Sequence, residues 1–365
     1  MRNSRLDSIR GLSALLIFVF HINGYTNSAD SMFSNAIDHI LSNMYIGVDL
    51  FFILSGYSLM KYTRFQAEAS SWICYVRRRF LRVVPAYYLT SCLWLLLPMA
   101  KFILVSLFPL GQYSQSGTFL VDFHMLERLL ANFLFVQWYL PQGDWILSGV
   151  TWTLVVEVQF YLLFPIFIRY VRGVVSFRGV VTTTCIAVIL EMLFRNTLNA
   201  GHVYMKTVIP YLPLFILGAT LAESAQRKRF LRGHTFLMFG LMSAATGLFV
   251  IDPNGSALVT SLKALCGSLT SVFLFCLALS IKVPDTVEKS LSLFGMVSFS
   301  FYLVHLNISD RVTQLVFRFI QGAFRIPVAI CLSFVLSLIV AMLFYVIVED
   351  WKNLKDRAAK LVKTR

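Results

Sequence analysis

The chain has 365 residues, of which 58% are hydrophobic and only 14% are charged, and its mean hydropathy is +0.72. A soluble domain carries about 25% charged and 45–50% apolar residues. The chain therefore requires lipid as its solvent, which excludes a secreted domain, a nucleic-acid-binding module and a disordered tail. The meaning of its formal net charge of +14 depends on where the charges lie.

The cysteines do not indicate a metal site or a disulfide framework. They are Cys74, Cys92, Cys185, Cys266, Cys276 and Cys331. None forms a CxxC pair and most lie in apolar runs, so we interpret them as small core hydrophobes. The N-terminus does not resemble a cleavable signal, because no small-residue cleavage site follows Arg2, Arg5, Arg10 and the apolar stretch after them.

Ten segments have the length and composition of membrane-spanning helices. Crossing about 30 Å of hydrocarbon requires roughly 20 apolar residues. The predicted spans are 11–26, 44–60, 83–108, 146–168, 179–195, 206–223, 235–251, 257–281, 291–308 and 327–349. A further apolar segment, 129–140, is more typical of an interfacial or re-entrant helix, because it is too short for a span.

The distribution of basic residues favours ten spans. With the N-terminus inside and 129–140 not spanning, 24 of the 32 Lys and Arg residues fall in cytoplasmic segments. If 129–140 spanned, 15 of those 24 would lie outside, against the positive-inside rule. The sequence therefore predicts an all-α integral membrane protein with about ten transmembrane helices and both termini cytoplasmic. It forms one polytopic domain over 1–365, with a short basic tail at 350–365.

Ionisable residues within spans indicate functional sites, because they are expensive in lipid. Arg10 and His21 are 11 residues apart, about 16 Å along a helix and within roughly 20° of three full turns. They therefore share one helical face, with Arg10 at the cytoplasmic mouth and His21 near the midplane. Asp7, one turn before Arg10, can pair with it.

A carboxylate in the fourth span is predicted at a depth similar to that of His21. Glu157 lies 12 residues before Arg169, at the cytoplasmic end of that span, which is about 18 Å along a helix. If the two helices adjoin, a histidine that accepts a proton and a carboxylate that orients it make a general-base pair. The alternatives are a packing histidine and, for Glu157, a structural hydrogen bond between helices.

An arginine cluster marks the start of the third span. It consists of Arg77, Arg78, Arg79 and Arg82, and the last two share a helical face. Guanidinium groups match phosphates, although topological anchoring explains the cluster equally well. Near the outer end of the ninth span, His305 is either functional or an interfacial polar residue.

Four blocks in order resemble the signatures of the membrane acyltransferase-3 family. They are LDSIRG at 6–11 followed by His21, GVDLFFILSGY at 47–57, RFLRVVP at 79–85 and WTLVVEVQFYLLFP at 152–165. A fifth block, SFSFYLVH at 298–305, looks like the family's late serine–tyrosine–histidine block. The resemblance covers almost the whole chain. It implies a membrane-bound O-acyltransferase that moves an acyl group, usually acetyl, from cytosolic acyl-CoA to a glycan hydroxyl on the far face.

The matching motifs imply that His21 is the catalytic base and that Arg10 is its essential partner. Glu157 is a third catalytic candidate because of its predicted depth. Arg79 and Arg82 match the family's RxxR motif. With Arg78, they are candidates for binding the phosphates of acetyl-CoA, the expected acyl donor. The candidates for substrate contact or structural support are Asp7, Ser55, Tyr57, Trp152, Tyr302 and His305. Direct transfer and an acyl-histidine intermediate are both compatible with these residues.

The resemblance also implies partners and a location. We expect a multi-pass protein of the bacterial cytoplasmic (inner) membrane that meets acyl-CoA and a glycan or lipid-linked saccharide such as O-antigen or exopolysaccharide, with no metal and no nucleic acid. Some family members append an esterase-like domain with a Gly-Asp-Ser block, which this sequence lacks. We therefore expect a single-domain member, alone or with a separate periplasmic partner. The aromatic outer segment 111–148 suits sugar stacking or an interfacial belt.

The competing class is a polytopic transporter or flippase that moves a lipid-linked sugar or small molecule without acyl transfer. Transporters often show repeated halves with paired polar residues at the midplane. In this sequence Arg10, His21 and Glu157 have no counterpart in the second half. A structural scaffold would leave His21 and Glu157 unexplained.

Overall fold

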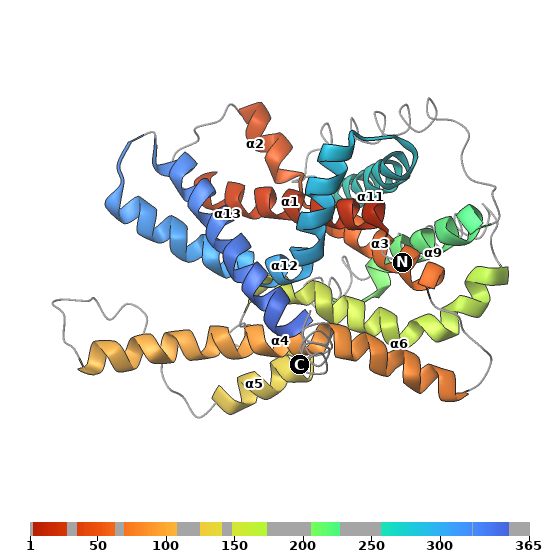
Figure 1. Cartoon of the computed structure of the whole chain (residues 1–365), viewed down its shortest axis with the longest axis horizontal. Coiled ribbons are helices and arrows are strands. Elements are labelled where there is room, and N and C mark those ends of the chain that lie inside the picture. The colour runs from red at the N-terminus through yellow and green to blue at the C-terminus, as the bar shows by residue number, and fades with distance from the viewer. Residues whose placement is uncertain are drawn as a thin grey trace, which may run out of the picture.

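The computed structural model describes residues 3–27, 35–62, 69–107, 125–140, 148–173, 206–226, 257–322 and 324–349. Within these ranges every regular element is a helix, and no strand is present (Figure 1). The α-helices are α1 (Ser4–Asn27), α2 (Asn35–Ser42), α3 (Ile46–Tyr62), α4 (Ala69–Leu107), α5 (Met125–Phe133), α6 (Trp152–Gly173), α9 (Leu212–Gln226), α11 (Ala257–Ser280), α12 (Asp285–Phe319) and α13 (Arg325–Phe344). The other helical segments are the 3₁₀ helices η2 (Gly149–Thr151) and η3 (Ile209–Tyr211) and the π-helix η4 (Tyr345–Glu349).

Helix length and composition confirm the all-α membrane class. Within the described ranges, five stretches are long and apolar enough to cross a membrane: Ser4–Gly24, Asp38–Tyr62, Gly149–Ile166, Asp285–Phe319 and Arg325–Val348. Shorter apolar helices occupy Ile209–Glu223 and Leu265–Ser280. The predicted spans 179–195 and 235–251 and the tail 350–365 lie outside the described residues. Ten spans and cytoplasmic termini therefore stay predictions.

Two helices extend beyond the spans predicted for them. α4 begins at Ala69 and not at 83, and α12 continues to Phe319 and not to 308. The 39 residues of α4 measure about 58 Å, well beyond a hydrocarbon core of about 30 Å. Hydropathy locates only the part of a helix that lies in lipid, whereas arginine is a good helix former that extends the same helix into water. The arginine cluster consequently lies on a helix.

The apolar segment 129–140 does not form a span. α5 has nine residues, about 13 Å of helix. The carbonyl groups at its end accept hydrogen bonds from α4, with Tyr87 Oη at 3.0 Å from the Asn132 oxygen and Tyr88 Oη at 2.8 Å from the Phe133 oxygen. These bonds satisfy backbone groups that a helix end leaves free, so the short helix ends against α4.

Glycines bring α1 and α12 into backbone contact. A Cβ atom on Gly295 would lie 1.8 Å from the carbonyl oxygen of Asp7, and one on Gly11 would lie 2.4 Å from a carbonyl oxygen of α12. Small residues permit such close packing in lipid, where hydrophobicity does not drive helices together. The contacts advance along both helices from Asp7 with Gly295 to Phe18 with Phe301, whose ring centroids are 5.8 Å apart. α1 and α12 are therefore parallel, as the predicted topology requires.

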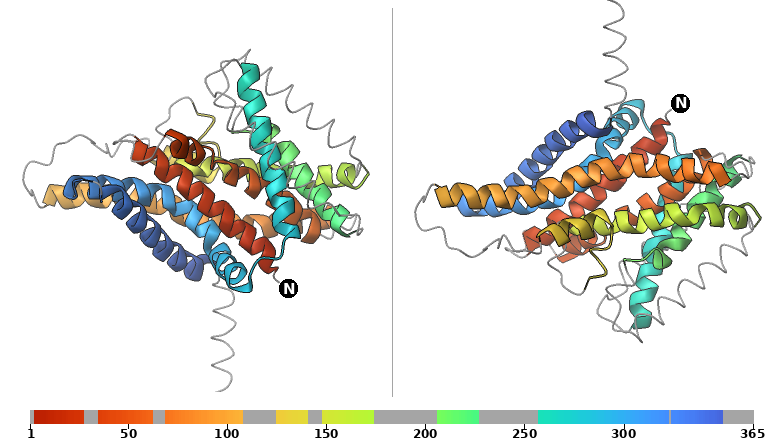
Figure 2. Two further views of the ribbon diagram at one scale, coloured as in Figure 1. Left: turned by 90° about the horizontal axis from the view of Figure 1, so that it is seen from above. Right: turned by 90° about the horizontal axis from the view of Figure 1, so that it is seen from below.

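A second glycine pair holds α9 against α3. A Cβ atom on Gly218 would lie 1.9 Å from the oxygen of Ile53, and one on Gly56 would lie 2.0 Å from that of Phe215. Twelve of the 17 residues of α3 are buried, because this helix contacts α1, α6, α9 and α11. α3 is thus the central helix, with α12 and α13 on one side of α1 and α9 and α11 on the other (Figure 2).

We expect Gly295→Ala to lower both activity and stability, because its methyl group cannot coexist with the Asp7 carbonyl and must push α12 away from α1. Overpacking of this kind costs about 1–3 kcal/mol. Thermal unfolding of the detergent-purified protein measures the loss. Gly24→Ala is the matched control, since nothing lies within 4 Å of the Cβ position at Gly24. Equal melting temperatures for the two variants would contradict the packing argument.

Candidate active site

A cavity lies between α1, α3, α4, α6 and α12, each of which contributes to its wall. Its empty volume, including the opening, is about 840 Å³. The lining residues are Arg10, Val48, Phe51, Phe52, Leu54, Ser55, Ser58, Leu59, Arg79, Arg82, Val83, Thr153, Leu154, Glu157, Tyr161, Ser298, Phe299 and Tyr302. Because α1 and α12 are parallel, positions along these helices define the two ends of the cavity. The three arginines lie at one end and Tyr302 lies at the other.

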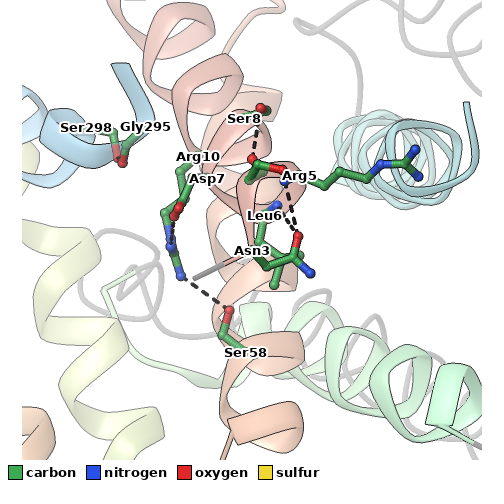
Figure 3. A network of polar contacts seen from close by, with 10 residues as sticks. Asn3, Arg5, Leu6, Asp7, Ser8, Arg10, Ser58, Gly295 and Ser298 are labelled. Atoms are coloured by element: carbon green, nitrogen blue, oxygen red, sulfur yellow. Dashed lines mark hydrogen bonds and ion pairs between the residues drawn. The ribbon is translucent and has the colours of Figure 1, made fainter. Parts of the chain in front are cut away.

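Arg10 stands at the charged end of the cavity. Its Nη1 lies 2.6 Å from Asp7 Oδ1, and its Nη2 donates to Ser58 Oγ at 3.4 Å (Figure 3). The Asp7 side chain is only 2% exposed, whereas that of Arg10 is 23% exposed. The predicted Asp7–Arg10 pair is therefore confirmed. Because the Asp7 carbonyl also contacts Gly295, the ion pair lies at the crossing of α1 and α12.

α4 brings two further guanidinium groups to the same end. The Arg79 guanidinium lies 5.7 Å from the ring centroid of Tyr75 and 6.0 Å from that of Tyr161. Arg82 is exposed and lies close enough to Arg10 for the two like charges to repel each other. The shared face predicted for Arg79 and Arg82 is thus the face that meets the cavity.

Arg78 points elsewhere on the same helix. It is exposed, its Nε donates to the carbonyl of Cys74 at 3.2 Å, and it is not part of the cavity wall. Adjacent positions on a helix differ by about 100°, which explains why Arg78 does not share the face of Arg79 and Arg82. The structure therefore separates Arg78 from the two arginines with which it was grouped.

Glu157 occupies the middle of the wall and is held by two hydroxyl groups. Ser55 Oγ on α3 and Tyr161 Oη on α6 both donate hydrogen bonds to Glu157 Oε1. All three residues line the cavity. The bond from Ser55 links two helices, which is the structural hydrogen bond predicted as the alternative role of Glu157.

Tyr302 closes the uncharged end of the cavity. Its Oη accepts a hydrogen bond from Thr153 Oγ1 at 2.8 Å and donates one to the carbonyl of Val150 at 3.0 Å. The ring of Phe51 meets it edge-on, with centroids 5.8 Å apart. Both hydrogen-bonding functions of the phenol are thereby used, and the ring is fixed in place.

His21 and His305 lie directly beyond Tyr302. His21 Nδ1 is 3.2 Å from His305 Nε2, and the ring centroids are 5.1 Å apart. The rings of Tyr302 and His305 have centroids 5.7 Å apart. His305 is 1% exposed, whereas His21 is half-buried. Neither histidine belongs to the wall that the described residues form around the cavity, so Tyr302 lies between the cavity and the predicted base.

The residue that the structure brings to His21 is thus His305, while Glu157 is bonded to Ser55 and Tyr161. Residue counts along the two helices predicted that His21 and Glu157 lie at similar depths. Depth along a helix does not specify which neighbour that helix faces, and the contact that decided the partner comes from a segment 284 positions away in the sequence.

Two other candidates, Tyr57 and Trp152, lie outside the cavity wall. Tyr57 packs edge-on against Phe275, with ring centroids 5.4 Å apart. The ring of Trp152 lies 4.5 Å from Lys206 Nζ, which is also 4.7 Å from the ring of Trp138. An ammonium group between two indole rings makes favourable cation–π contacts, so Trp152 joins the start of α6 to the segments around 138 and 206.

Four hydroxyl-bearing residues of the wall were not among the predicted site residues, namely Ser58, Thr153, Tyr161 and Ser298. Hydroxyl groups in helices commonly bond to their own backbone, so their presence alone does not indicate a site. The available signal was that Thr153 and Tyr161 belong to the block at 152–165. Their importance follows only from the contacts that they make with Tyr302 and Glu157.

Comparison with known proteins identifies the family. The sequence model of the acyltransferase-3 family, described as an acyltransferase domain, matches residues 3–346. The chain therefore belongs to this family of membrane acyltransferases. No solved structure matches the chain.

Similarity to curated proteins extends over different parts of the chain. An acyltransferase of Streptomyces mycarofaciens, MdmB, is 32% identical over 178 residues, 47% of this chain and 41% of that protein. The O-acetyltransferase OatA of Staphylococcus aureus strain NCTC 8325 / PS 47 is 23% identical over 389 residues, 94% of this chain and 56% of that protein. The peptidoglycan O-acetyltransferase OatA of Listeria monocytogenes is 26% identical over 181 residues, 46% of this chain and 25% of that protein. The chain spans about half or less of the length of these relatives.

We expect Glu157→Ala to destabilise the protein more than Glu157→Gln does. The alanine leaves the hydroxyl groups of Ser55 and Tyr161 without their acceptor, at a cost of about 1–3 kcal/mol, whereas glutamine retains one acceptor oxygen. Thermal unfolding in detergent measures both variants against the wild type. Similar losses for alanine and glutamine would show that the charge of Glu157, and not its two hydrogen bonds, stabilises the fold.

Proposed function

We propose that the protein is an O-acyltransferase of the bacterial inner membrane. It transfers an acyl group, first of all acetyl, from cytoplasmic acyl-CoA to a hydroxyl of an extracytoplasmic glycan such as O-antigen or exopolysaccharide. The observation that supports this most strongly is the cavity that runs from three guanidinium groups to Tyr302, whose ring lies 5.7 Å from that of His305 on the far side. The relatives described above, which are O-acetyltransferases and an acyltransferase, support the choice of acetyl and of an oxygen acceptor.

The arginine end suits the charged part of acyl-CoA. Arg10, Arg79 and Arg82 outnumber the two nearby carboxylates of Asp7 and Glu157, so the mouth carries excess positive charge. Hydrogen bonds from guanidinium groups to phosphates are short and about twice as strong as those between neutral groups. The phosphates of CoA complete this charge balance, and the apolar part of the wall accommodates the pantetheine arm.

In the proposed reaction His21 acts as the general base. The acceptor O–H bond breaks as its proton passes to the imidazole, and the oxygen forms a bond to the thioester carbonyl carbon. The C–S bond then breaks, and the imidazolium returns the proton to the thiolate. The products are the ester and CoA thiol, so atoms and charges balance. An acyl-histidine intermediate would divide the same exchange into two steps.

Arg10 acts at the donor and not at the reacting carbonyl in this scheme. It lies about three helical turns from His21, and it contacts Asp7 and Ser58 at the charged end. Its essential role is therefore to hold the phosphates, with Asp7 fixing the orientation of the guanidinium group.

We expect surface polysaccharide to carry ester-linked acetyl when the wild-type chain is expressed in a bacterium that lacks it, and to lose that acetyl with His21→Ala. The alanine removes the base that takes the acceptor proton. Proton NMR of the isolated polysaccharide detects the ester, and the shifted sugar proton identifies the acetylated position. His39→Ala, expressed at matched membrane levels, is the histidine control. Unchanged acetylation by His21→Ala would remove His21 from the mechanism.

Consumption of acetyl-CoA distinguishes an acyltransferase from a transporter or flippase. The purified enzyme is expected to release CoA thiol from acetyl-CoA when an acceptor saccharide is present, which a thiol reagent measures directly. A transporter would move its substrate without consuming acetyl-CoA. The protein is supplied with polysaccharide extracted from the native membrane. If correctly folded protein then releases no CoA, the result would favour the transporter.

Arg79→Ala and Arg82→Ala should each raise the KM for acetyl-CoA about tenfold or more, because a hydrogen bond to a charged group contributes about 1.5–3 kcal/mol. Initial rates of CoA release over a range of acetyl-CoA concentrations supply the values. Arg78→Ala is the matched control, since this exposed arginine lies on the same helix but outside the cavity wall. An equal increase for Arg78→Ala would indicate a general effect of positive charge and not a built phosphate site.

A further inference from the structure

Two imidazole rings from different helices meet in a direct contact between ring nitrogens. His21 Nδ1 on α1 and His305 Nε2 on α12 are 3.2 Å apart. A hydrogen bond between two such atoms requires that one carries the proton and that the other supplies the lone pair. The groups around each ring determine which is which.

The surroundings of His305 assign its proton to Nδ1. This nitrogen lies 2.9 Å from the carbonyl oxygen of Tyr302 and 3.2 Å from that of Phe301. Carbonyl oxygens only accept hydrogen bonds, so Nδ1 is the donor. In the neutral ring, which carries a single N–H proton, Nε2 is then an acceptor directed at His21.

The surroundings of His21 lead to a matching assignment. Its Nδ1 lies 3.0 Å from the carbonyl oxygen of Ile17 and 3.2 Å from His305 Nε2. Both neighbours are acceptors, so His21 Nδ1 carries the proton and shares it between them. The basic lone pair of His21 is therefore on Nε2, the other ring nitrogen.

We infer that His305 is a positioning residue for acyl transfer. Together with the carbonyl of Ile17, it holds the proton of His21 on Nδ1 and thereby presents His21 Nε2 as the base that receives the proton of the acceptor hydroxyl. The inference rests on the proposed function and adds a residue to it. A general base in the wrong tautomer offers a proton where a lone pair is required. His305 is 1% exposed whereas His21 is half-buried, so His305 acts through His21 and not on the substrate.

Aromatic packing holds His305 in the orientation that this role requires. The ring of Phe301 is nearly parallel to it, at an interplanar angle of 4° and a centroid distance of 5.7 Å. The ring of Phe18 on α1 approaches edge-on at 6.4 Å. Two phenyl rings thus pack around the imidazole while its Nδ1 faces the carbonyl groups. A ring substitution at 305 should preserve this packing.

The test compares His305→Phe with His305→Gln. Phenylalanine retains the ring but removes the acceptor, so kcat for acetyl transfer should fall about 100-fold or more, with KM for acetyl-CoA within about twofold. Glutamine places an amide oxygen near the position of Nε2 and should retain kcat within about tenfold. Equal kcat values for His305→Phe and the wild type, at matched folded protein, would overturn the inference.

A spectroscopic measurement reads the tautomer without relying on activity. Nitrogen-15 NMR of histidine-labelled protein in lipid nanodiscs distinguishes protonated from unprotonated ring nitrogens, and the His21 signals are assigned by their loss in His21→Ala. The wild type should show His21 protonated at Nδ1, and His305→Phe should shift part of that population to Nε2. A wild-type His21 protonated at Nε2 would contradict the assignment. Failure of the wild type to release CoA would instead count against the proposed function, whatever the tautomer.

Discussion

The backbone contact between α1 and α12 is the constraint on which the rest of the site depends. At Asp7 and Gly295 the two helices approach so closely that a single methyl group would not fit. Because the helices are parallel, the same crossing sets the positions of Arg10 at one end of the cavity and of His21 beyond the other. In lipid, where apolar side chains gain little by leaving one apolar surface for another, contacts between small residues determine such a register.

Charge is distributed along the cavity in an order that suits transfer across a membrane. The guanidinium groups lie at one end, the hydroxyl-bound Glu157 lies in the middle of the wall, and Tyr302 lies at the other end. Fixed dipoles and charges act more strongly in such surroundings than in water, so the positive charge of the guanidinium groups has its effect at one end of the cavity. The imidazole pair lies beyond Tyr302, where His21 contacts the carbonyl of Ile17 and the ring of His305.

Much of this arrangement could be predicted from local sequence patterns. The apolar segments and the low charge content predicted an all-helical membrane protein, and the three-residue spacing predicted both the Asp7–Arg10 pair and the common face of Arg79 and Arg82. These predictions concern one helix at a time, where geometry is regular. The extensions of α4 and α12 were missed because hydropathy measures contact with lipid and a helix does not end where lipid ends.

The sequence by itself determined the all-helical membrane class and the family, and it predicted candidate residues for a lipid-embedded site. It could not determine which of those residues meet. Only the tertiary structure showed that His21 contacts His305 and that Glu157 accepts hydrogen bonds from Ser55 and Tyr161. The physical reason is that depth follows from counting along one helix, whereas contact depends on how that helix is rotated and which neighbour packs against it. Those two quantities are decided by side-chain packing between segments far apart in the chain.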